Sequence, residues 1–204
     1  MRRERGVLVV FSAPSGCGKG TVLKQVMAAN SNVFLSVSAT TRAPRSEDTD
    51  GVTYHFITHE RFQKLIDEDG MLEYASYCGN YYGTPRQAVL DRLDAGYDVV
   101  LEIEVQGALQ VKEKFPEAVM IFMLPPSVEE LARRLTARQT EDDGTIRKRM
   151  KTAISEMELA PRYDYVLIND TVEETAERFA AIISAERAKP SRMKERMDEV
   201  LYDA

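Results

Sequence analysis

The chain has 204 residues, a length that fits one globular domain with a substantial core. Its 44% hydrophobic and 29% charged residues exclude a disordered chain, and no stretch approaches the roughly 18 apolar residues of a membrane span, so we expect a cytoplasmic protein with no membrane partner. The formal net charge of −6, from 27 Lys and Arg against 33 Asp and Glu, argues against broad binding to nucleic acid.

The opening segment has the pattern of a strand that is buried on both faces. Gly6 to Ser12 reads GVLVVFS, a run of β-branched and apolar residues with no polar alternation. A glycine-rich turn follows it, and then a helical stretch from Thr21 to about Ala29. The order strand, glycine-rich turn, helix is the context that a phosphate-binding loop requires.

The turn itself also resembles such a loop. It reads Ala13-Pro14-Ser15-Gly16-Cys17-Gly18-Lys19-Gly20-Thr21, close to the pattern G-x-x-x-x-G-K-[ST]. Glycines let backbone N–H groups turn toward phosphate oxygens, the helix N-terminus adds partial positive charge, and Lys19 adds a full charge. A glycine-rich turn with an incidental lysine is the alternative, which the flanking elements disfavour. The loop predicts a nucleoside triphosphate site without choosing between GTPases, ATPases and small-molecule kinases.

Two departures from the pattern bear on magnesium. Ala13 replaces the first glycine, and Gly20 replaces the hydroxyl residue that usually contacts Mg²⁺. Thr21, one place later, is then the nearest hydroxyl. We therefore expect Mg²⁺ to be held mainly by the nucleotide and water, with Thr21 or Glu102 as the candidates for a direct contact.

The character of the chain changes between Ser38 and Asp94. Strands such as Thr53 to Ile57 and Met71 to Tyr77 are shorter and more polar, and turn signals at Asp50-Gly51 and Gly79-Asn80 separate them. This pattern predicts an antiparallel insertion.

Buried strands return after the insertion. Asp98 to Ile103 and Val119 to Leu124 are each followed by helical spacing, which predicts a parallel sheet. A very polar stretch near Arg138 indicates a mobile helical hairpin or an ordinary solvated helix pair. A last strand, Tyr165 to Ile168, and a helix from about Val172 to Arg187 would close the core.

Several blocks of the sequence together resemble the guanylate kinases. They begin with SVSATTRAPR from Ser36 and continue with MLEYA from Met71, GNYYGT from Gly79, LEIEVQG from Leu101 and VLIND from Val166. Their order and spacing also fit, and the resemblance covers about residues 5–187. It implies an α/β fold with a P-loop parallel-sheet core flanked by helices, a mixed α/β GMP-binding insertion and a helical lid.

The resemblance also implies an activity, the transfer of the γ-phosphoryl group of ATP to GMP or dGMP, giving ADP and GDP or dGDP. It further implies one guanylate kinase-like domain over residues 1–204. Its parts would be a core of about 5–37, 95–137 and 158–187, a GMP-binding insertion of about 38–94, a lid of about 138–157 and a C-terminal tail of 188–204. The sequence leaves open whether the chain is a monomer or a homo-oligomer.

The chemistry of guanine fits the residues that the resemblance assigns to the base. Guanine presents N1–H and N2–H₂ as adjacent donors and O6 as an acceptor, so one carboxylate takes two hydrogen bonds while a hydroxyl serves O6. The matching residues are Glu73, Ser38 and Thr84. Adenine at the same place would leave the carboxylate without a partner, so GMP should be preferred to AMP.

The other assignments concern phosphate groups. Arg42, Arg45, Tyr54 and Tyr82 would bind the GMP phosphate, because guanidinium groups match a dianion with bidentate hydrogen bonds. The resemblance also assigns Glu102 to the GMP site. It assigns Ala13 to Thr21, Arg134 and Asn169 to the ATP site, and Lys19, Arg138 and Arg149 to catalysis at the reacting phosphates. For Glu104, a solvated loop carboxylate and a water-mediated metal contact both stay open.

Two other functions compete with the kinase. A guanylate-kinase-like binding module would have lost part of the nucleotide-binding set, whereas Lys19, Arg42, Glu73 and Arg149 are all present. Another nucleoside monophosphate kinase or a GTPase is disfavoured by the combination of Glu73 with Ser38 and by the lack of GTPase-type guanine motifs.

Overall fold

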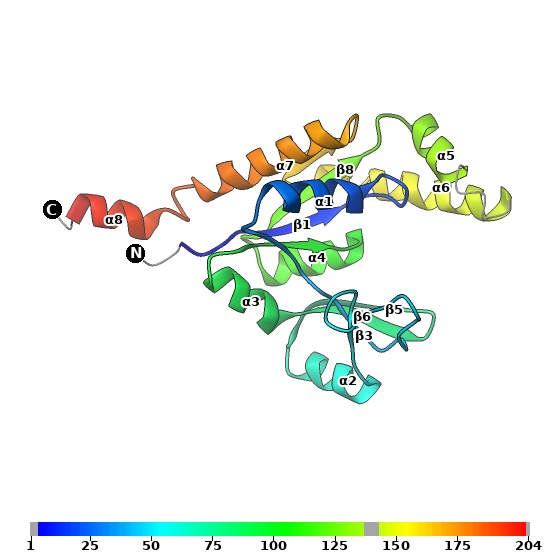
Figure 1. Ribbon diagram of the computed structural model, residues 1–204, viewed down its shortest axis with the longest axis horizontal. Coiled ribbons are helices and arrows are strands. Elements are labelled where there is room, and N and C mark those ends of the chain that lie inside the picture. Colours follow the sequence, from blue (N-terminus) through cyan, green and yellow to red (C-terminus); the bar gives the residue numbers. More distant parts are fainter. Residues whose placement is uncertain (1–3, 137–142, 203–204) are drawn as a thin grey trace.

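The core of the protein is a parallel sheet of five strands in the order β2-β7-β1-β8-β9 (Figure 1). The computed structural model describes residues 4–136 and 143–202. All four neighbouring pairs in this sheet run parallel, which confirms the predicted parallel sheet. The strands are β1 (Leu8–Ser12), β2 (Val33–Leu35), β7 (Asp98–Glu102), β8 (Val119–Leu124) and β9 (Tyr165–Ile168).

Helices cover both faces of this sheet because its central strands are apolar on both sides. In β1, Val9 and Phe11 face a cluster formed with α1 (Lys19–Ala29) and α7 (Val172–Arg187), where the rings of Phe11 and Phe179 meet edge to face at 5.0 Å. Leu8 and Val10 face the opposite cluster, formed with α3 (Arg86–Asp94) and α4 (Val105–Lys114). Figure 1 shows the two helix layers above and below the sheet.

A second, smaller sheet lies beneath the α3 and α4 layer, with strands in the order β4-β3-β6-β5. It comprises β3 (Ala39–Thr40), β4 (His55–Phe56), β5 (Met71–Tyr77) and β6 (Asn80–Pro85), with α2 (His59–Asp67) between β4 and β5. The prediction of an antiparallel insertion is wrong for one pair, since β3 and β4 are parallel. Residues 41–54 connect the end of β3 to the start of β4, because two parallel strands need a long connection that returns the chain to the same end of the sheet.

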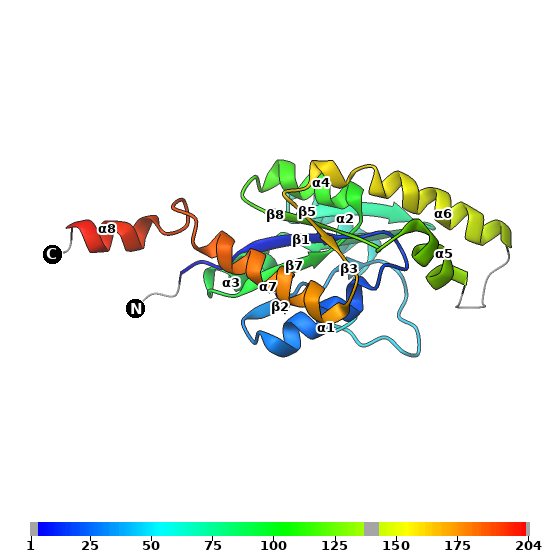
Figure 2. The same ribbon diagram turned by 90° about the horizontal axis from the view of Figure 1, so that it is seen from above.

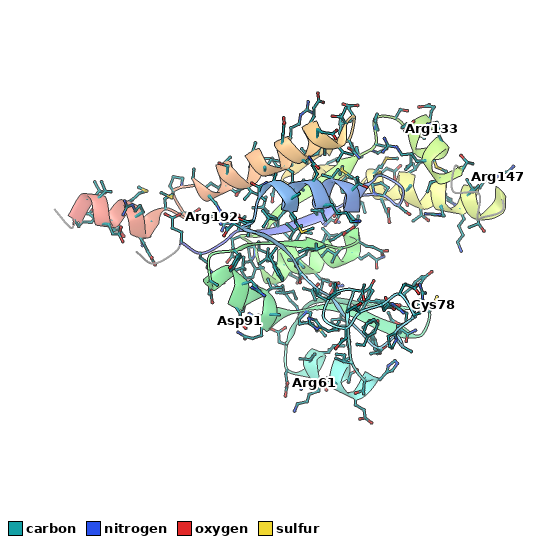
Figure 3. All side chains as sticks on the ribbon, in the orientation of Figure 1. Arg61, Cys78, Asp91, Arg133, Arg147 and Arg192 are labelled. Carbon is teal, nitrogen blue, oxygen red and sulfur yellow. The ribbon has the colours of Figure 1, made fainter. Side chains whose placement is uncertain are left out.

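The hairpin between β5 and β6 turns one residue earlier than predicted. Tyr77 pairs with Asn80, so Cys78 and Gly79 form the turn, with φ values of 48° and 77°. Positive φ at both turn residues matches the right-handed twist of the flanking strands. Cys78 is exposed at this tip, at the same end of the molecule as the labelled Arg147 (Figure 3).

The remaining helices lie at opposite ends of the molecule. At one end are α5 (Val128–Thr136) and α6 (Asp143–Met157), followed by the short 3-10 helix η1 (Ala160–Arg162). At the other, α8 (Lys194–Tyr202) extends away from the body and has no buried residue (Figure 2). Within 4–136 and 143–202, no helix is both long and apolar enough to cross a membrane.

The contact between β1 and α7 predicts a stability effect. Phe179 is fully buried, so Phe179→Ala should lower the free energy of unfolding by about 3–5 kcal/mol, as measured by urea denaturation. The matched control is Tyr202→Ala, because Tyr202 is 77% exposed and its loss should change stability by less than about 0.5 kcal/mol. Equal losses in the two variants would contradict the packing described here.

Candidate active site

The loop between β1 and α1 surrounds a pocket of about 410 Å³. Gly16 and Gly18 have φ values of 93° and 87°, conformations that favour glycine. The N-cap residue of α1 is Gly18, which has no side chain to cap the helix, so it leaves the first N–H groups of α1 available to a ligand. The pocket brings the predicted loop residues together with Glu102 and with Lys24, which the sequence analysis did not single out; its lining is Ala13, Pro14, Ser15, Gly16, Cys17, Gly18, Lys19, Gly20, Thr21, Lys24 and Glu102.

Two side chains donate hydrogen bonds to the backbone of the loop. Asn169 Nδ2 donates to the carbonyl oxygen of Cys17 at 2.7 Å, and Arg134 Nη1 donates to the same oxygen at 3.3 Å. Asn169 is only 3% exposed, and its Oδ1 accepts a hydrogen bond from Thr175 Oγ1 at 3.1 Å. Asn169 and Arg134 therefore contact the backbone of the loop. Burial raises the pKa of the Cys17 thiol to about 11, so this thiol stays protonated at neutral pH.

Strand pairing brings Lys19 and Glu102 together. Phe11, near the end of β1, pairs with Glu102, the last residue of β7, and the loop after β1 leads directly to Lys19. Lys19 Nζ lies 3.9 Å from Glu102 Oε1. Lys19 and its carboxylate partner thus both line the pocket.

The helices α5 and α6 supply arginines on another side of the loop. Arg149 Nη2, on α6, donates to Ser15 Oγ at 2.6 Å. Arg133, in the last turn of α5 and labelled in Figure 3, forms an ion pair with Glu130 and is largely exposed. Arg138, the other predicted lid arginine, lies outside the described residues. Of the two predicted lid arginines, Arg149 is therefore placed against the phosphate loop.

The second sheet carries a buried carboxylate paired with a hydroxyl. Glu73 on β5 is directly opposite Thr84 on β6, and Thr84 Oγ1 donates to Glu73 Oε1 at 2.6 Å. Both residues are buried, with exposures of 6% and 1%. Burial raises the pKa of Glu73, and the hydrogen bonds from Thr84 oppose that rise. Ser38 comes immediately before β3, the neighbour of β6 in the same sheet.

Aromatic rings and a carboxylate surround one of the predicted phosphate-binding arginines. The Arg42 guanidinium lies 5.5 Å from the ring centroids of Tyr54 and Phe56, and Tyr54 meets Tyr82 edge to face at 6.0 Å. Arg42 Nη1 forms an ion pair with Asp48 Oδ2 at 2.9 Å.

Asp48 is a residue that the sequence analysis missed. Its Oδ2 also accepts a hydrogen bond from the Arg45 backbone N–H at 2.7 Å, so one carboxylate contacts both Arg42 and Arg45. The hydrogen bond from Arg42 is the main cause that lowers the Asp48 pKa. A carboxylate within a few residues of two arginines was the available sequence signal.

Two further carboxylates lie near the two sites. Glu156, on α6, is half-buried, and its pKa is raised by burial and by the negative charge of Glu104. The charge of Glu104 also raises the pKa of Glu73. Glu104 thus interacts with both, whereas nothing in the spacing of α6 distinguished Glu156 from a surface glutamate. No three His, Cys, Asp or Glu side chains among the described residues are arranged to hold a metal ion.

Comparisons with known proteins agree with this arrangement. The family model for guanylate kinase matches residues 5–186. The guanylate kinase of Halalkalibacterium halodurans is 48% identical over 201 residues, covering 98% of each chain, and that of Caldanaerobacter subterraneus is 49% identical over 193 residues, covering 95% of this chain and 94% of the relative. The crystal structure of guanylate kinase from Anaplasma phagocytophilum has a TM-score of 0.76 and 35% identity, and the match covers 100% of this chain and 99% of that one. With its fold and sequence matched over nearly their full length, the chain belongs to the guanylate kinase family.

Proposed function

We propose that the loop pocket binds ATP and that the second sheet binds GMP, with the buried pair Glu73 and Thr84 as the observation that carries the assignment. As a guanylate kinase, the chain is a nucleoside monophosphate kinase that transfers the γ-phosphoryl group of ATP to GMP, yielding ADP and GDP. We also propose that it acts in the cytoplasm and accepts dGMP.

Guanine recognition starts from the ionised Glu73 carboxylate. Its two oxygens accept hydrogen bonds from N1–H and N2–H₂ of the base. Thr84 already donates its only hydroxyl proton to Glu73, so Ser38 is the hydroxyl that donates to O6. The ion pair between Arg42 and Asp48 holds the Arg42 guanidinium in place for the GMP phosphate. Arg45, Tyr54 and Tyr82 complete the phosphate-binding site.

The ATP phosphates bind the backbone N–H groups of the loop, the start of α1 and Lys19. Magnesium fits this pocket, because the Thr21 hydroxyl and the Glu102 carboxylate are the hard oxygen donors that Mg²⁺ prefers. When bound, Mg²⁺ neutralises charge on the phosphates that Lys19 contacts.

Transfer needs no general base, because the GMP phosphate is mostly dianionic at pH 7. Catalysis comes from positioning and from neutralising charge, with Lys19, Arg138 and Arg149 on the transferring group. Arg149 is already bonded to Ser15 of the loop. We propose that the lid, about 138–157, and the GMP-binding insertion, about 38–94, close on the core and exclude water. The core comprises about 5–37, 95–137 and 158–187, and residues 188–204 form a tail.

The carboxylate assignment predicts the effect of Glu73→Gln. The amide cannot accept both guanine donors, so kcat/KM for GMP should fall by about 10- to 100-fold, the usual loss for a hydrogen bond to a charged group. A coupled assay of ADP formation, with GMP, AMP, CMP and UMP offered separately, measures this change. Glu113→Gln, on the exposed side of α4, is the control and should leave the kinetics unchanged. Undiminished use of GMP by Glu73→Gln would overturn the assignment.

The charge on Lys19 predicts a loss in the chemical step. Lys19→Ala should lower kcat by about 10²–10³-fold, because the variant lacks the positive charge that the phosphates would contact. Lys194→Ala on α8 is the matched control and should retain full activity. A parental kcat for Lys19→Ala would refute a role at the phosphates.

Burial of Glu73 predicts a pH-dependent stability difference. The pKa of Glu73 is raised in the folded chain, so its contribution to stability is greatest below its unfolded pKa of about 4.5 and is lost as pH rises through the folded pKa. Glu73→Gln lacks this loss. Without GMP, the variant should gain unfolding free energy relative to the parent as the pH is raised above about 4.5, as measured by urea denaturation. A difference that does not change with pH would contradict the burial of a charge at this position.

A further inference from the structure

Gly107, in the first turn of α4, lies directly against the Glu73 carboxylate. A Cβ atom at position 107 would be 2.7 Å from Glu73 Oε2, 3.3 Å from Cδ and 3.4 Å from Cγ. The shortest of these distances is closer than real Cβ contacts, so any side chain at position 107 would force the carboxylate or the helix to move. Glu73 Oε2 can therefore occupy this position only because residue 107 has no side chain.

The strand that carries Glu73 is fixed to the same face of α4. Gln110 exchanges two hydrogen bonds of 3.2 Å with the backbone of Tyr74, the residue after Glu73. Lys114 Nζ donates to the carbonyl oxygen of Met71 at 2.9 Å. Positions 107, 110 and 114 recur at helical spacing and lie on one face of α4. Moving β5 away from position 107 would break these hydrogen bonds.

The other side of the carboxylate is also occupied. Thr84 donates to Oε1 at 2.6 Å, and Glu73 is only 6% exposed. The carboxylate thus lies between a hydroxyl on β6 and the backbone of α4. Displacement by a side chain at position 107 would have to disturb the Thr84 hydrogen bond or turn the carboxylate.

We propose that Gly107 is a positioning residue for base specificity, because its missing side chain sets where the Glu73 carboxylate stands. The inference rests on the proposed function of Glu73 as the group that binds guanine. Glycine in a helix costs up to about 1 kcal/mol relative to alanine, so the helix itself would favour alanine at this position. The space that glycine leaves is used by the carboxylate.

The test is Gly107→Ala in the full chain, with steady-state kinetics for each substrate. KM for GMP should rise about tenfold or more, while KM for ATP should stay within about twofold. Glu113→Ala, an exposed position on the same helix, is the control and should change none of these values. Unaltered GMP kinetics in Gly107→Ala would overturn the proposal.

A double-mutant cycle separates positioning from a general structural role. In a Glu73→Ala background the carboxylate is gone, so adding Gly107→Ala should change kcat/KM for GMP by less than about twofold. An equal loss in both backgrounds would show that Gly107 acts independently of Glu73 and would overturn the proposal. If Gly107→Ala unfolds the chain, the double variant should fold again. Failure of both variants to fold would also overturn the proposal.

The same cycle distinguishes this inference from the function on which it rests. Full use of GMP by Glu73→Ala alone would remove the base-binding role of Glu73 and this proposal with it. A strong loss in Glu73→Ala combined with parental kinetics in Gly107→Ala would remove only the role of Gly107.

Discussion

The parallel pairing of β1 with β7 and β8 is the constraint on which the pocket at the β1–α1 loop depends. Because all strands of the core sheet point the same way, the segments that follow them reach one edge. The loop after β1, Glu102 at the end of β7 and Asn169 after β9 meet there, although they are distant in sequence. The hydrogen bond from Asn169 to Cys17 then ties the loop to the far strand. In this guanylate kinase, the main-chain geometry of the sheet thus shapes the pocket.

Internal partners occupy the charged groups that the proposed mechanism assigns to substrates. Asp48 contacts Arg42, Ser15 contacts Arg149, and Glu102 contacts Lys19. Each partner holds the cation in place and each must share it, or release it, when a phosphate group arrives. In the proposed mechanism, substrate binding is therefore an exchange of partners, and the net gain in binding free energy is smaller than the number of new contacts suggests. Glu73 differs, because its cost is burial of charge, which guanine donors would offset.

The sequence predicted most reliably what depends on local patterns. Strands with uninterrupted apolar runs, such as Val119–Leu124 and Tyr165–Ile168, have the predicted bounds, and so does the helix Val172–Arg187. The short strand β2 and the parallel pair of β3 and β4 were not foreseen, because they contain only two or three residues and depend on partners far along the chain.

For the candidate site, too, the sequence predicted residue types better than it predicted contacts. The family pattern supplied the types of residue, such as Glu73, but not the contacts that decide their roles. The Thr84 hydroxyl donates a hydrogen bond to Glu73, Asn169 donates to a backbone carbonyl, and Asp48 accepts a hydrogen bond from the Arg45 backbone N–H. These facts depend on tertiary packing that no local spacing encodes. The prediction for Arg138 falls outside the described residues.

The tip of the β5–β6 hairpin gives the protein a natural attachment point for a reporter group. The chain has two cysteines, and burial protects the Cys17 thiol and raises its pKa to about 11, whereas Cys78 is exposed at the tip. A maleimide reagent should therefore label Cys78 selectively without any prior mutation, since thiolate character and access control the reaction. An environment-sensitive fluorophore there would report on any movement of the second sheet, without a change to the protein's own sequence.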